Sequence, residues 1–330
     1  MKKIVSFFGD RSELFTELNQ KAADYAASLG MEYRWAPQLP FDQEDVIREL
    51  NRADAGIIDV EPYGEPIFSR IAEGARLLVR FGVGYDKVDL AAASRAGIAV
   101  ARTTAANTTG VAEMALTLML AAKRRLKLAQ TRTQSGIWVK DVGHELIGGT
   151  VGILGYGNIG RRLRRLLTGF DCRVLVHDPF VDGDSIRADG AEPAALEELF
   201  RLSDAVSIHV PYSPETHHLV DRRLLSLMKP TAVIVNTARG NIIDEDDLYE
   251  ALKSGQLAGA GIDVFAREPL PVTSPLLTLD NAFLTPHDAS QTVESLWNIY
   301  KMAIDICADH FAGRLSPHIL NPDWSDHGKS

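Results

Sequence analysis

Residues 151–163 read VGILGYGNIGRRL, and the fold is decided here. Gly155, Gly157 and Gly160 fit the pattern G-x-G-x-x-G, directly after an apolar strand candidate and directly before a helical pattern. In such a turn the first glycine permits a tight bend, the second lets the backbone approach a pyrophosphate, and the third lets helix and strand pack closely. A lone match is weak, because glycines also serve plain packing, but the flanking strand and helix favour dinucleotide binding.

The residues around these glycines support the same interpretation. Backbone N–H groups at the start of the helix would face the phosphates. The residues expected there are Tyr156, Asn158 and Ile159. A second strand candidate, RVLVHDPF, contains Asp178, eighteen residues after Gly160 (178 − 160). An acid at that position accepts hydrogen bonds from the adenosine ribose and repels a 2′-phosphate, so it favours NAD over NADP.

Short apolar runs alternate with helix-like segments along the whole chain. The strand candidates of the first hundred residues are KIVSFF, MEYRW, AGIID, RLLVR and GIAV. After residue 145 the candidates are TVGILG, RVLVH, AVSIH, AVIVN, AGAGID and AFLT. Near-continuous apolar strands are typical of sheets covered on both faces, and the alternation predicts parallel α/β sheets with right-handed crossovers.

Composition excludes several classes of protein. The chain has 330 residues with 45% hydrophobic and 24% charged residues, as expected of a globular protein with a large core. A net charge of −9 does not suit nucleic acid or anionic lipid. Two distant cysteines, Cys172 and Cys307, form no disulfide or zinc pattern and suggest a reducing compartment, the cytoplasm. The apolar stretch 111–122 is too short to span a bilayer.

Further motifs follow one another in a specific order. They are GVGYDKVDL at 82–90, VAEMALTLML at 111–120, GIW at 136–138, VPYSPETHHLV at 210–220, VNTARGNIIDEDDL at 235–248, GAGIDVFAREPLP at 259–271 and TPHDAS at 285–290. With the glycine pattern, they make the chain resemble the D-isomer-specific 2-hydroxyacid dehydrogenase family, in particular its phosphoglycerate dehydrogenases and hydroxypyruvate or glyoxylate reductases. The resemblance runs from about residue 50 to NPDW at 321–324.

The resemblance implies a two-domain α/β fold. A Rossmann-type NAD-binding domain, residues 104–285, is expected to be inserted into a flavodoxin-like α/β substrate domain, residues 1–103 and 286–330. It implies NAD as the cofactor and a small 2-keto or 2-hydroxy acid as the substrate.

Three catalytic positions are carried over from the family: Arg239 in TARG, Glu268 in REP and His287 in TPH. Histidine titrates near neutrality, so it can deliver a proton to the carbonyl oxygen and take it back. A carboxylate beside the imidazole would orient it, and a guanidinium binds a carboxylate bidentately. Singly, each residue is more often a surface or turn residue. All three follow strand candidates, at the edge where open α/β sheets bind ligands.

The other expected contacts rest mainly on the resemblance. Further cofactor contacts are Val210, Pro211, Thr216, Thr237, Ala238, Asp263 and Ser290. Substrate contacts are Tyr63, Arg80, Val83 and Gly84, with Tyr63 in a loop over the substrate and the backbone N–H groups of Val83 and Gly84 on its carboxylate. Two roles are considered equally for Arg80. It either forms a buried ion pair or contacts a phosphate or a second carboxylate. No metal site is expected.

One residue departs from the family pattern. Asp288 follows His287, where the family usually has an apolar or small neutral residue. Its side chain either points to solvent or approaches His287, and in the second case it would shift the pH optimum upward.

The function expected is NAD-dependent, reversible hydride transfer to a small 2-keto acid of the hydroxypyruvate, glyoxylate or phosphoglycerate type. An NAD(H)-sensing binding protein, similar to the corepressors related to this family, is the alternative. A homodimer is expected through the helix at 111–122, because that helix resembles the family's dimer element.

Overall fold

The computed structural model describes residues 1–71 and 73–327, and the chain divides into two compact units. Unit 1 contains Met1–Asn107 together with the chain from Val293 onward, and unit 2 contains Thr108–Thr292. Unit 2 is therefore an insertion between the two sequence segments of unit 1. Within the described ranges, no helix has both the length and the apolar character needed to cross a membrane.

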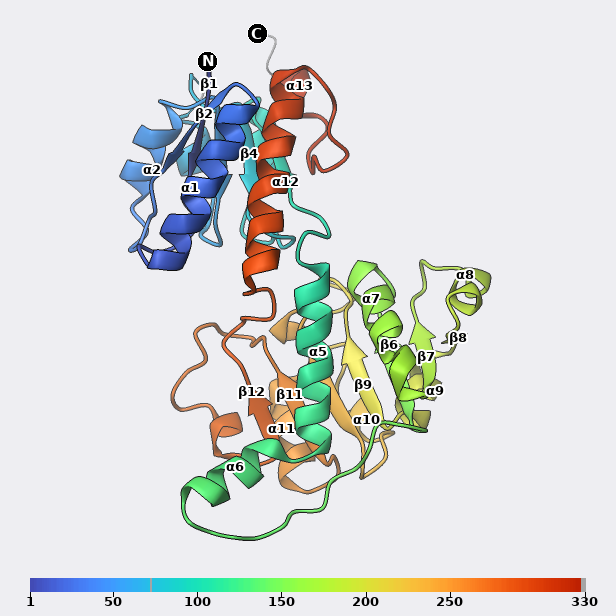
Figure 1. The fold of residues 1–330 in the computed structure, drawn as a ribbon. Helices are drawn as coiled ribbons and strands as arrows, with labels where there is room; N and C mark the ends of the chain where they lie inside the picture. Colours follow the sequence, from blue (N-terminus) through green and yellow to red (C-terminus); the bar gives the residue numbers. More distant parts are fainter. Residues whose placement is uncertain (72, 328–330) are drawn as a thin grey trace. The chain divides into compact units, whose positions relative to one another are not determined.

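Unit 1 is built on a five-stranded parallel sheet (Figure 1). Its strands are β1 (Lys2–Ser6), β2 (Met31–Trp35), β3 (Ala55–Ile58), β4 (Leu77–Arg80) and β5 (Ala99–Arg102). Its helices are α1 (Glu13–Ser28), α2 (Gln43–Leu50), α3 (Glu65–Phe68), α4 (Leu90–Arg95), α12 (Val293–Phe311) and α13 (Trp324–His327). The strand order β2-β1-β3-β4-β5 is the flavodoxin-like order, as expected.

Both faces of this sheet are covered, which explains its near-continuous apolar strands. Adjacent residues of β3 enter opposite cores: Ile57 packs on the side of α1 and α12, and Ile58 packs on the side of α2 and α3. In Figure 1, α12 runs beside α1 although the two are far apart in sequence. The C-terminal segment thus completes the core that the first hundred residues begin.

Unit 2 is built on a seven-stranded parallel sheet. Its strands are β6 (Thr150–Leu154), β7 (Arg173–His177), β8 (Glu192–Pro193), β9 (Ala205–Ile208), β10 (Val233–Asn236), β11 (Gly259–Ile262) and β12 (Ala282–Leu284). Its α-helices are α5 (Thr108–Lys123), α6 (Leu126–Gln134), α7 (Asn158–Leu166), α8 (Gly183–Ala188), α9 (Leu196–Leu202), α10 (Arg222–Leu225) and α11 (Glu245–Lys253). Three short 3₁₀ segments are η1 (Leu167–Phe170), η2 (Gly240–Ile242) and η3 (Pro275–Thr278).

The strand order β12-β11-β10-β9-β6-β7-β8 reverses direction between β6 and β9. This is the Rossmann arrangement, in which a dinucleotide lies across the carboxyl ends of the strands at the reversal. Helix α5 lies along one face of the sheet and contacts β10, β11 and α7 (Figure 1). Most of its apolar residues are buried in this way, so the helix expected to form a dimer is largely covered within its own unit.

The unit boundaries differ from those expected from the sequence. Residues 286–292, expected in the substrate domain, group with unit 2. Hydrogen bonds from the backbone of this segment to Asp263 explain the difference. The N–H of His287 donates to the Asp263 carbonyl oxygen (2.8 Å), and the N–H groups of Asp288 and Ala289 donate to its carboxylate (3.0 Å each).

Asp204 connects the starts of two central strands of unit 2. Its carboxylate accepts hydrogen bonds from the Lys229 ammonium (2.7 Å) and from the Thr150 N–H (2.8 Å). Burial by itself would raise the pKa of Asp204, but these bonds and the positive charges outweigh it and leave the pKa below its ordinary value of 3.8. A carboxyl whose pKa falls on folding stabilises the fold above its unfolded pKa and loses that effect as the pH falls through its folded pKa.

We therefore expect Asp204→Asn to lower the free energy of unfolding by about 1 kcal/mol at neutral pH. The loss should hold down to about pH 5 and shrink below about pH 4, where the wild-type carboxyl also becomes protonated. Urea unfolding followed at several pH values measures it. Asp184→Asn is the control, because the Asp184 side chain is 97% exposed. If Asp204→Asn lowered the free energy of unfolding by the same amount near pH 2, the effect would not come from the ion pair.

Candidate active site

The glycine turn after β6 brings backbone segments too close for side chains. Gly155 has φ +94°, and a Cβ there would lie 2.7 Å from the carbonyl carbon of His209 and from the Val210 nitrogen. A Cβ on Gly160 would lie 2.4 Å from the Gly155 oxygen. A Cβ on Gly157 would meet nothing within 4 Å, so the space in front of this residue is open. The first and third glycines allow close packing, and the second borders a space where a ligand can approach.

This open space lies at the start of α7, whose N-cap is Gly157. Gly157 has no side chain to cap the helix, so the first N–H groups, from Asn158 and Ile159 onward, face this space, as a pyrophosphate requires. Asp178 lies at the end of β7 and accepts hydrogen bonds from the N–H of Tyr156 (2.7 Å) and of Phe180 (2.9 Å). The acid is thereby held beside the glycine turn. These residues fit an NAD dinucleotide.

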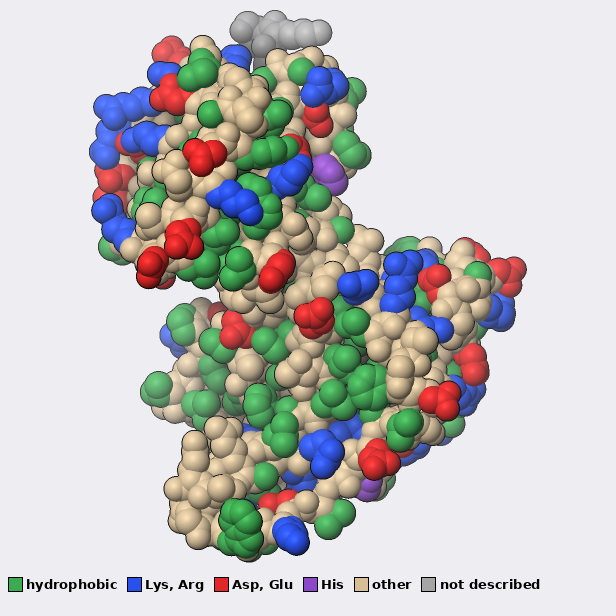
Figure 2. All heavy atoms as spheres, in the orientation of Figure 1, with side chains coloured by type: hydrophobic (Ala, Val, Ile, Leu, Met, Phe, Trp, Pro, Cys, Tyr) green, Lys and Arg blue, Asp and Glu red, His purple; other side chains and the backbone are tan. Residues whose placement is uncertain are grey.

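The Tyr156 side chain does not take part in this space. It is 1% exposed and belongs to the core on the α5 face of unit 2, so its expected contact is limited to the backbone. The Arg161 guanidinium stacks over its ring, 4.7 Å from the centroid, and pairs with Asp189. Figure 2 shows basic side chains gathered over α7. Arg164, an arginine of that helix, donates to the Gly190 oxygen (3.0 Å).

His287 and Glu268 form a direct pair. The Nδ1 atom of His287 lies 2.8 Å from the Glu268 carboxylate, and the other carboxylate oxygen accepts the Phe265 N–H (3.0 Å). Burial alone would raise the pKa of Glu268, but the bonds from His287 and Phe265, with the nearby charges of His287 and Arg239, leave it below its ordinary value. Glu268 is therefore a carboxylate at neutral pH and holds the imidazole by one nitrogen.

Arg239 approaches the same pair from the end of β10. Asn236, 1% exposed, accepts the Ala238 N–H (3.0 Å) and donates to the Arg239 carbonyl (2.9 Å), so it fixes the turn that carries the guanidinium. One Arg239 nitrogen also donates to the Ala238 oxygen (2.8 Å). Since the Arg239 charge contributes to the low pKa of Glu268, the three residues expected to be catalytic lie together within unit 2.

The backbone of His287 has φ +57°, the left-handed conformation that a residue with a side chain rarely adopts. Asp263, 0% exposed, stabilises it through the backbone bonds described above, and the Thr285 hydroxyl donates to the same carboxylate (2.6 Å). Sequence reasoning missed the roles of Asn236 and Thr285. The sequence feature that could have indicated these roles is a polar residue at the end of an apolar strand.

The orientation of the Asp288 side chain corresponds to neither of the two considered. One of its carboxyl oxygens is buried without a hydrogen-bond partner among the described residues, so the side chain does not point to solvent. It faces Asp263: burial, a hydrogen bond to the Asp263 carboxyl and the charge of that group raise the pKa of Asp288. The nearby charge of His287 acts in the opposite direction.

The remaining expected cofactor residues lie at the same edge of the sheet. Val210 and Pro211 follow β9, and the Thr216 hydroxyl donates to the Pro211 oxygen (2.8 Å) and accepts the Ser213 N–H (2.7 Å). Thr216 thus holds its own loop. The Thr237 hydroxyl is buried without a partner among the described residues, and Ser290 is half-buried.

The residues expected to bind substrate lie in unit 1, and one differs from expectation. Tyr63 is 1% exposed and packs in the core, with its ring 6.1 Å from that of Phe41, so it is no exposed loop contact. Val83 and Gly84 are half-buried in the loop after β4. The Arg80 guanidinium lies 3.9 Å from the Asp59 carboxylate. Of the two interpretations considered for Arg80, this distance favours the ion pair.

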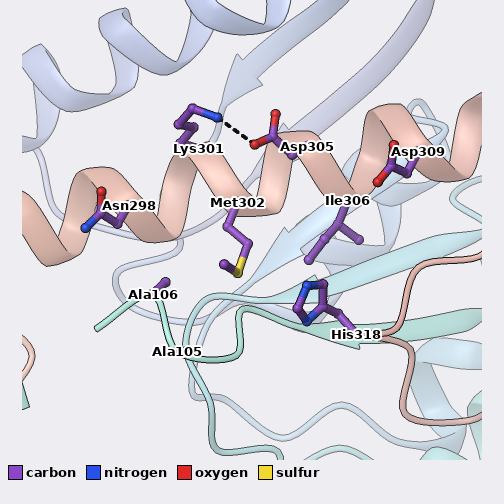
Figure 3. A pocket seen from close by; sticks show the side chains of 9 residues that line it. All are labelled: Ala105, Ala106, Asn298, Lys301, Met302, Asp305, Ile306, Asp309 and His318. Carbon is purple, nitrogen blue, oxygen red and sulfur yellow. Dashed lines mark hydrogen bonds and ion pairs between the residues drawn. The ribbon is translucent and has the colours of Figure 1, made fainter. Parts of the chain in front are cut away.

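Two other features lie apart from these residues. A hollow of about 390 Å³ borders α12 in unit 1 and contains the Lys301–Asp305 ion pair (2.8 Å) (Figure 3). None of the residues expected at the site lines it. In the described part of the chain, no group of three or more His, Cys, Asp or Glu side chains is placed to hold a metal ion.

His209, which directly follows β9, is hydrogen-bonded through one of its two ring nitrogens. Its Nε2 atom lies 2.9 Å from the Ser207 hydroxyl, while Nδ1 is buried without a partner among the described residues. Burial lowers the pKa of His209 to about 4, so the ring is neutral at physiological pH.

Comparison with known proteins agrees with this geometry. The family model described as D-isomer specific 2-hydroxyacid dehydrogenase, NAD binding domain, matches residues 116–289. A glyoxylate reductase of Korarchaeum cryptofilum is 35% identical over 298 residues, which cover 88% of this chain and 89% of that protein. The apo-structure of D-lactate dehydrogenase from Escherichia coli superposes with a TM-score of 0.83 at 30% identity, covering 97% of this chain and 100% of that one.

A D-3-phosphoglycerate dehydrogenase of Archaeoglobus fulgidus is 34% identical over 284 residues. The match covers 86% of this chain but 54% of that protein, so the chain spans about half the length of this relative. The chain belongs to the D-isomer-specific 2-hydroxyacid dehydrogenase family. It is an NAD-dependent oxidoreductase that acts on the CH–OH group of 2-hydroxy acids.

We expect Asp178→Asn to weaken NADH binding by about tenfold and to reduce the preference for NADH over NADPH by a similar factor, because the neutral amide no longer repels a 2′-phosphate. Fluorescence titration with both nucleotides measures these affinities. Asp184→Asn in α8, a fully exposed acid of the same unit, controls for net charge. An unchanged NADH/NADPH ratio would refute the role of Asp178.

Proposed function

We propose that this enzyme reduces a small 2-keto acid of the hydroxypyruvate, glyoxylate or phosphoglycerate type, with His287 as the proton donor. The observation that carries the proposal is the 2.8 Å contact between His287 Nδ1 and the Glu268 carboxylate, beside Arg239 and in the unit that fits NAD. The reaction needs a proton at the carbonyl oxygen, and this pair is built to supply one.

Glu268 positions the proton donor. As a carboxylate that contacts Nδ1, it fixes the plane and the tautomer of the imidazole and stabilises the ring when it is positively charged. The Nε2 atom then holds the proton that the substrate oxygen receives, and it takes the proton back in the oxidation direction. Bound NAD supplies or accepts the hydride. No other residue of the chain has to change its protonation state.

Arg239 and the loop after β4 are the proposed substrate anchors. A guanidinium donates two parallel hydrogen bonds to a carboxylate and polarises a neighbouring carbonyl. The backbone N–H groups of Val83 and Gly84 are proposed to receive the substrate carboxylate, and Gly82, with φ +123°, allows the chain to turn there. The proposed cofactor contacts beyond the glycine turn are Val210, Pro211, Thr216, Thr237, Ala238, Asp263 and Ser290.

We expect His287→Ala to lower kcat by roughly a hundredfold to ten-thousandfold with any 2-keto acid that the wild type reduces. NADH affinity should stay nearly unchanged, because His287 acts on the substrate. Glu268→Gln should lower kcat by a smaller factor, on the order of tenfold or more. NADH oxidation with glyoxylate, hydroxypyruvate, phosphohydroxypyruvate, pyruvate and a branched 2-keto acid provides the measurement.

Glu250→Gln, an exposed acid on α11, is the matched control and should behave as the wild type. Turnover that survives in His287→Ala would remove the proton-donor role. NADH binding without turnover of any acid by the wild type would favour the alternative, an NAD(H)-sensing protein similar to a corepressor.

A homodimer in the cytoplasm is the proposed state of the enzyme. Both cysteines are free thiols, which suits a reducing compartment. The loop after α6 runs away from the sheet of unit 2 in Figure 1 and exposes several apolar side chains. They are Ile137 (49%), Trp138 (86%), Val139 (56%), Val142 (84%) and Ile147 (57%). The dimer contact through residues 111–122 stays a prediction, and we propose that a second copy of the chain also buries this loop.

We expect the wild type to sediment as a dimer at micromolar concentration and Trp138→Ser/Val142→Ser to raise the dissociation constant by at least about tenfold, because the exposed apolar area to be buried shrinks. Val272→Ser, at a residue 93% exposed elsewhere in unit 2, is the control. A monomeric wild type would contradict the proposal.

A further inference from the structure

Asp59 occupies a distinctive place in unit 1. It directly follows β3, and the order β2-β1-β3-β4-β5 changes direction between β1 and β3. In open parallel sheets, ligands bind outside the carboxyl ends of the strands at such a reversal. The Phe7 N–H donates to the Ile57 oxygen (3.0 Å), so the ends of β1 and β3 adjoin just before Asp59. Asp59 thus lies at the ligand-binding edge of this unit.

Arg80 lies next to it, at the end of the neighbouring strand. The Nη1 atom of Arg80 is 3.9 Å from Oδ1 of Asp59, and the side chains are 11% and 19% exposed. A Cβ on Gly82 would lie 3.7 Å from the same nitrogen, which places the guanidinium beside the loop proposed to bind the substrate carboxylate. A substrate held at that loop would therefore place its remaining atoms within reach of both charges.

The distance within the pair suits a hydroxyl group. At 3.9 Å, Asp59 and Arg80 are too far apart for a direct hydrogen bond, and an oxygen atom placed about 2.8 Å from each would bridge them. The same Arg80 nitrogen also donates to the Phe81 carbonyl oxygen. The bridging oxygen would accept from the guanidinium and donate to the carboxylate. A hydroxyl does both, whereas the oxygens of an ionised phosphate only accept.

The charges of the pair oppose a phosphate as well. Burial and the charge of Glu61 raise the pKa of Asp59 to about 6, with Arg80 acting in the opposite direction, so the carboxylate is mostly ionised at neutral pH. It offsets the charge of Arg80. A phosphate monoester, with a charge of about −1.5 to −2, would face a half-buried carboxylate and find no net positive charge.

A nearby tyrosine supplies an independent observation. The Tyr63 hydroxyl is buried and has no hydrogen-bond partner in the described ranges 1–71 and 73–327. Burial raises the pKa of Tyr63, and the negative charges of Glu61 and Asp59 add to the rise, so the neutral hydroxyl lies near the pair. An unpaired buried hydroxyl next to a carboxylate and a guanidinium is a polar group without a protein partner, as found where a ligand binds.

We propose that Asp59, together with Arg80, is a specificity-determining pair that selects 2-keto acids with a neutral hydroxyl group at carbon 3 and rejects their phosphorylated counterparts. This inference rests on the proposed function and adds the substrate class to it. It assigns Arg80 to the recognition of a hydroxyl rather than of a phosphate.

The test compares hydroxypyruvate with 3-phosphohydroxypyruvate. For the wild type, kcat/KM with hydroxypyruvate should exceed that with the phosphorylated acid by a factor of about a hundred or more. Asp59→Asn keeps the shape and removes the charge, so it should reduce this ratio at least about tenfold, mainly by raising kcat/KM for the phosphorylated acid. Glu65→Gln, at an exposed acid of the same unit, should leave the ratio unchanged.

The outcomes separate the two proposals. Turnover of 2-keto acids with an equal ratio in Asp59→Asn and the wild type, or a wild type that prefers the phosphorylated acid, overturns this inference alone. No turnover of any 2-keto acid overturns the proposed function and this inference with it. A ratio that falls in Asp59→Asn and not in Glu65→Gln supports both.

A second measurement covers a variant that fails to fold. On the wild type alone, D-glycerate should inhibit NADH oxidation at a concentration at least about tenfold lower than D-3-phosphoglycerate does. Equal inhibition, or tighter inhibition by the phosphorylated acid, would overturn the inference without any substitution.

Discussion

The buried carboxylate of Asp263 organises the chemistry of unit 2. It accepts hydrogen bonds from the Thr285 hydroxyl and from two successive backbone N–H groups, those of Asp288 and Ala289. These bonds hold the backbone of His287, which lies just before Asp288, in a left-handed conformation. That conformation costs free energy in isolation. Because the His287 imidazole contacts Glu268 in that conformation, the proposed proton donor depends on a buried carboxylate that does not itself pair with the imidazole.

The parallel sheet explains why this arrangement is possible. Arg239, Glu268 and His287 follow β10, β11 and β12, three adjacent strands that end at one edge. Side chains far apart in sequence are thereby gathered. The backbone of the first turn is fixed by Asn236, and that of the last turn by Asp263. The glycine turn after β6 belongs to the same edge, so the residues that fit NAD and those that handle the proton share one rigid support.

The sequence allowed the strands and the residue types at their ends to be predicted, since apolar runs and glycine spacing report directly on backbone geometry. The strands from KIVSFF to AFLT correspond to β1–β7 and β9–β12, and among the strands of residues 1–71 and 73–327 the two-residue β8 was missed. Side-chain direction was harder to predict. Tyr63 lies in the expected loop, but its ring is buried, and the Asp288 side chain faces Asp263. A pattern of residue types does not record which way a loop side chain turns, because distant segments decide it.

The dimer contact expected through residues 111–122 stays a prediction, because the burial of α5 within unit 2 does not test it. The helix at 111–122 is apolar enough to suggest an interface, yet β10, β11 and α7 already cover most of it. An apolar sequence shows only that a surface must be buried, and whether the same unit or a second copy buries it depends on the packing of the sheet. Several exposed apolar residues, such as Trp138 and Val142, lie instead in the loop after α6, where apolar and polar residues alternate irregularly.

The groups proposed for the reaction are divided between the two units. Those proposed to hold NAD and to donate the proton belong to unit 2, while Asp59, Arg80 and the loop at Val83 belong to unit 1. Relatives named for glyoxylate, 3-phosphoglycerate and D-lactate share 30–35% of residues with this chain, so substrate choice varies on a common framework. Asp59 follows a strand of one sheet, and the Glu268–His287 pair follows strands of the other. The selectivity proposed for Asp59 would therefore rest on residues that share no strand with the proposed proton donor.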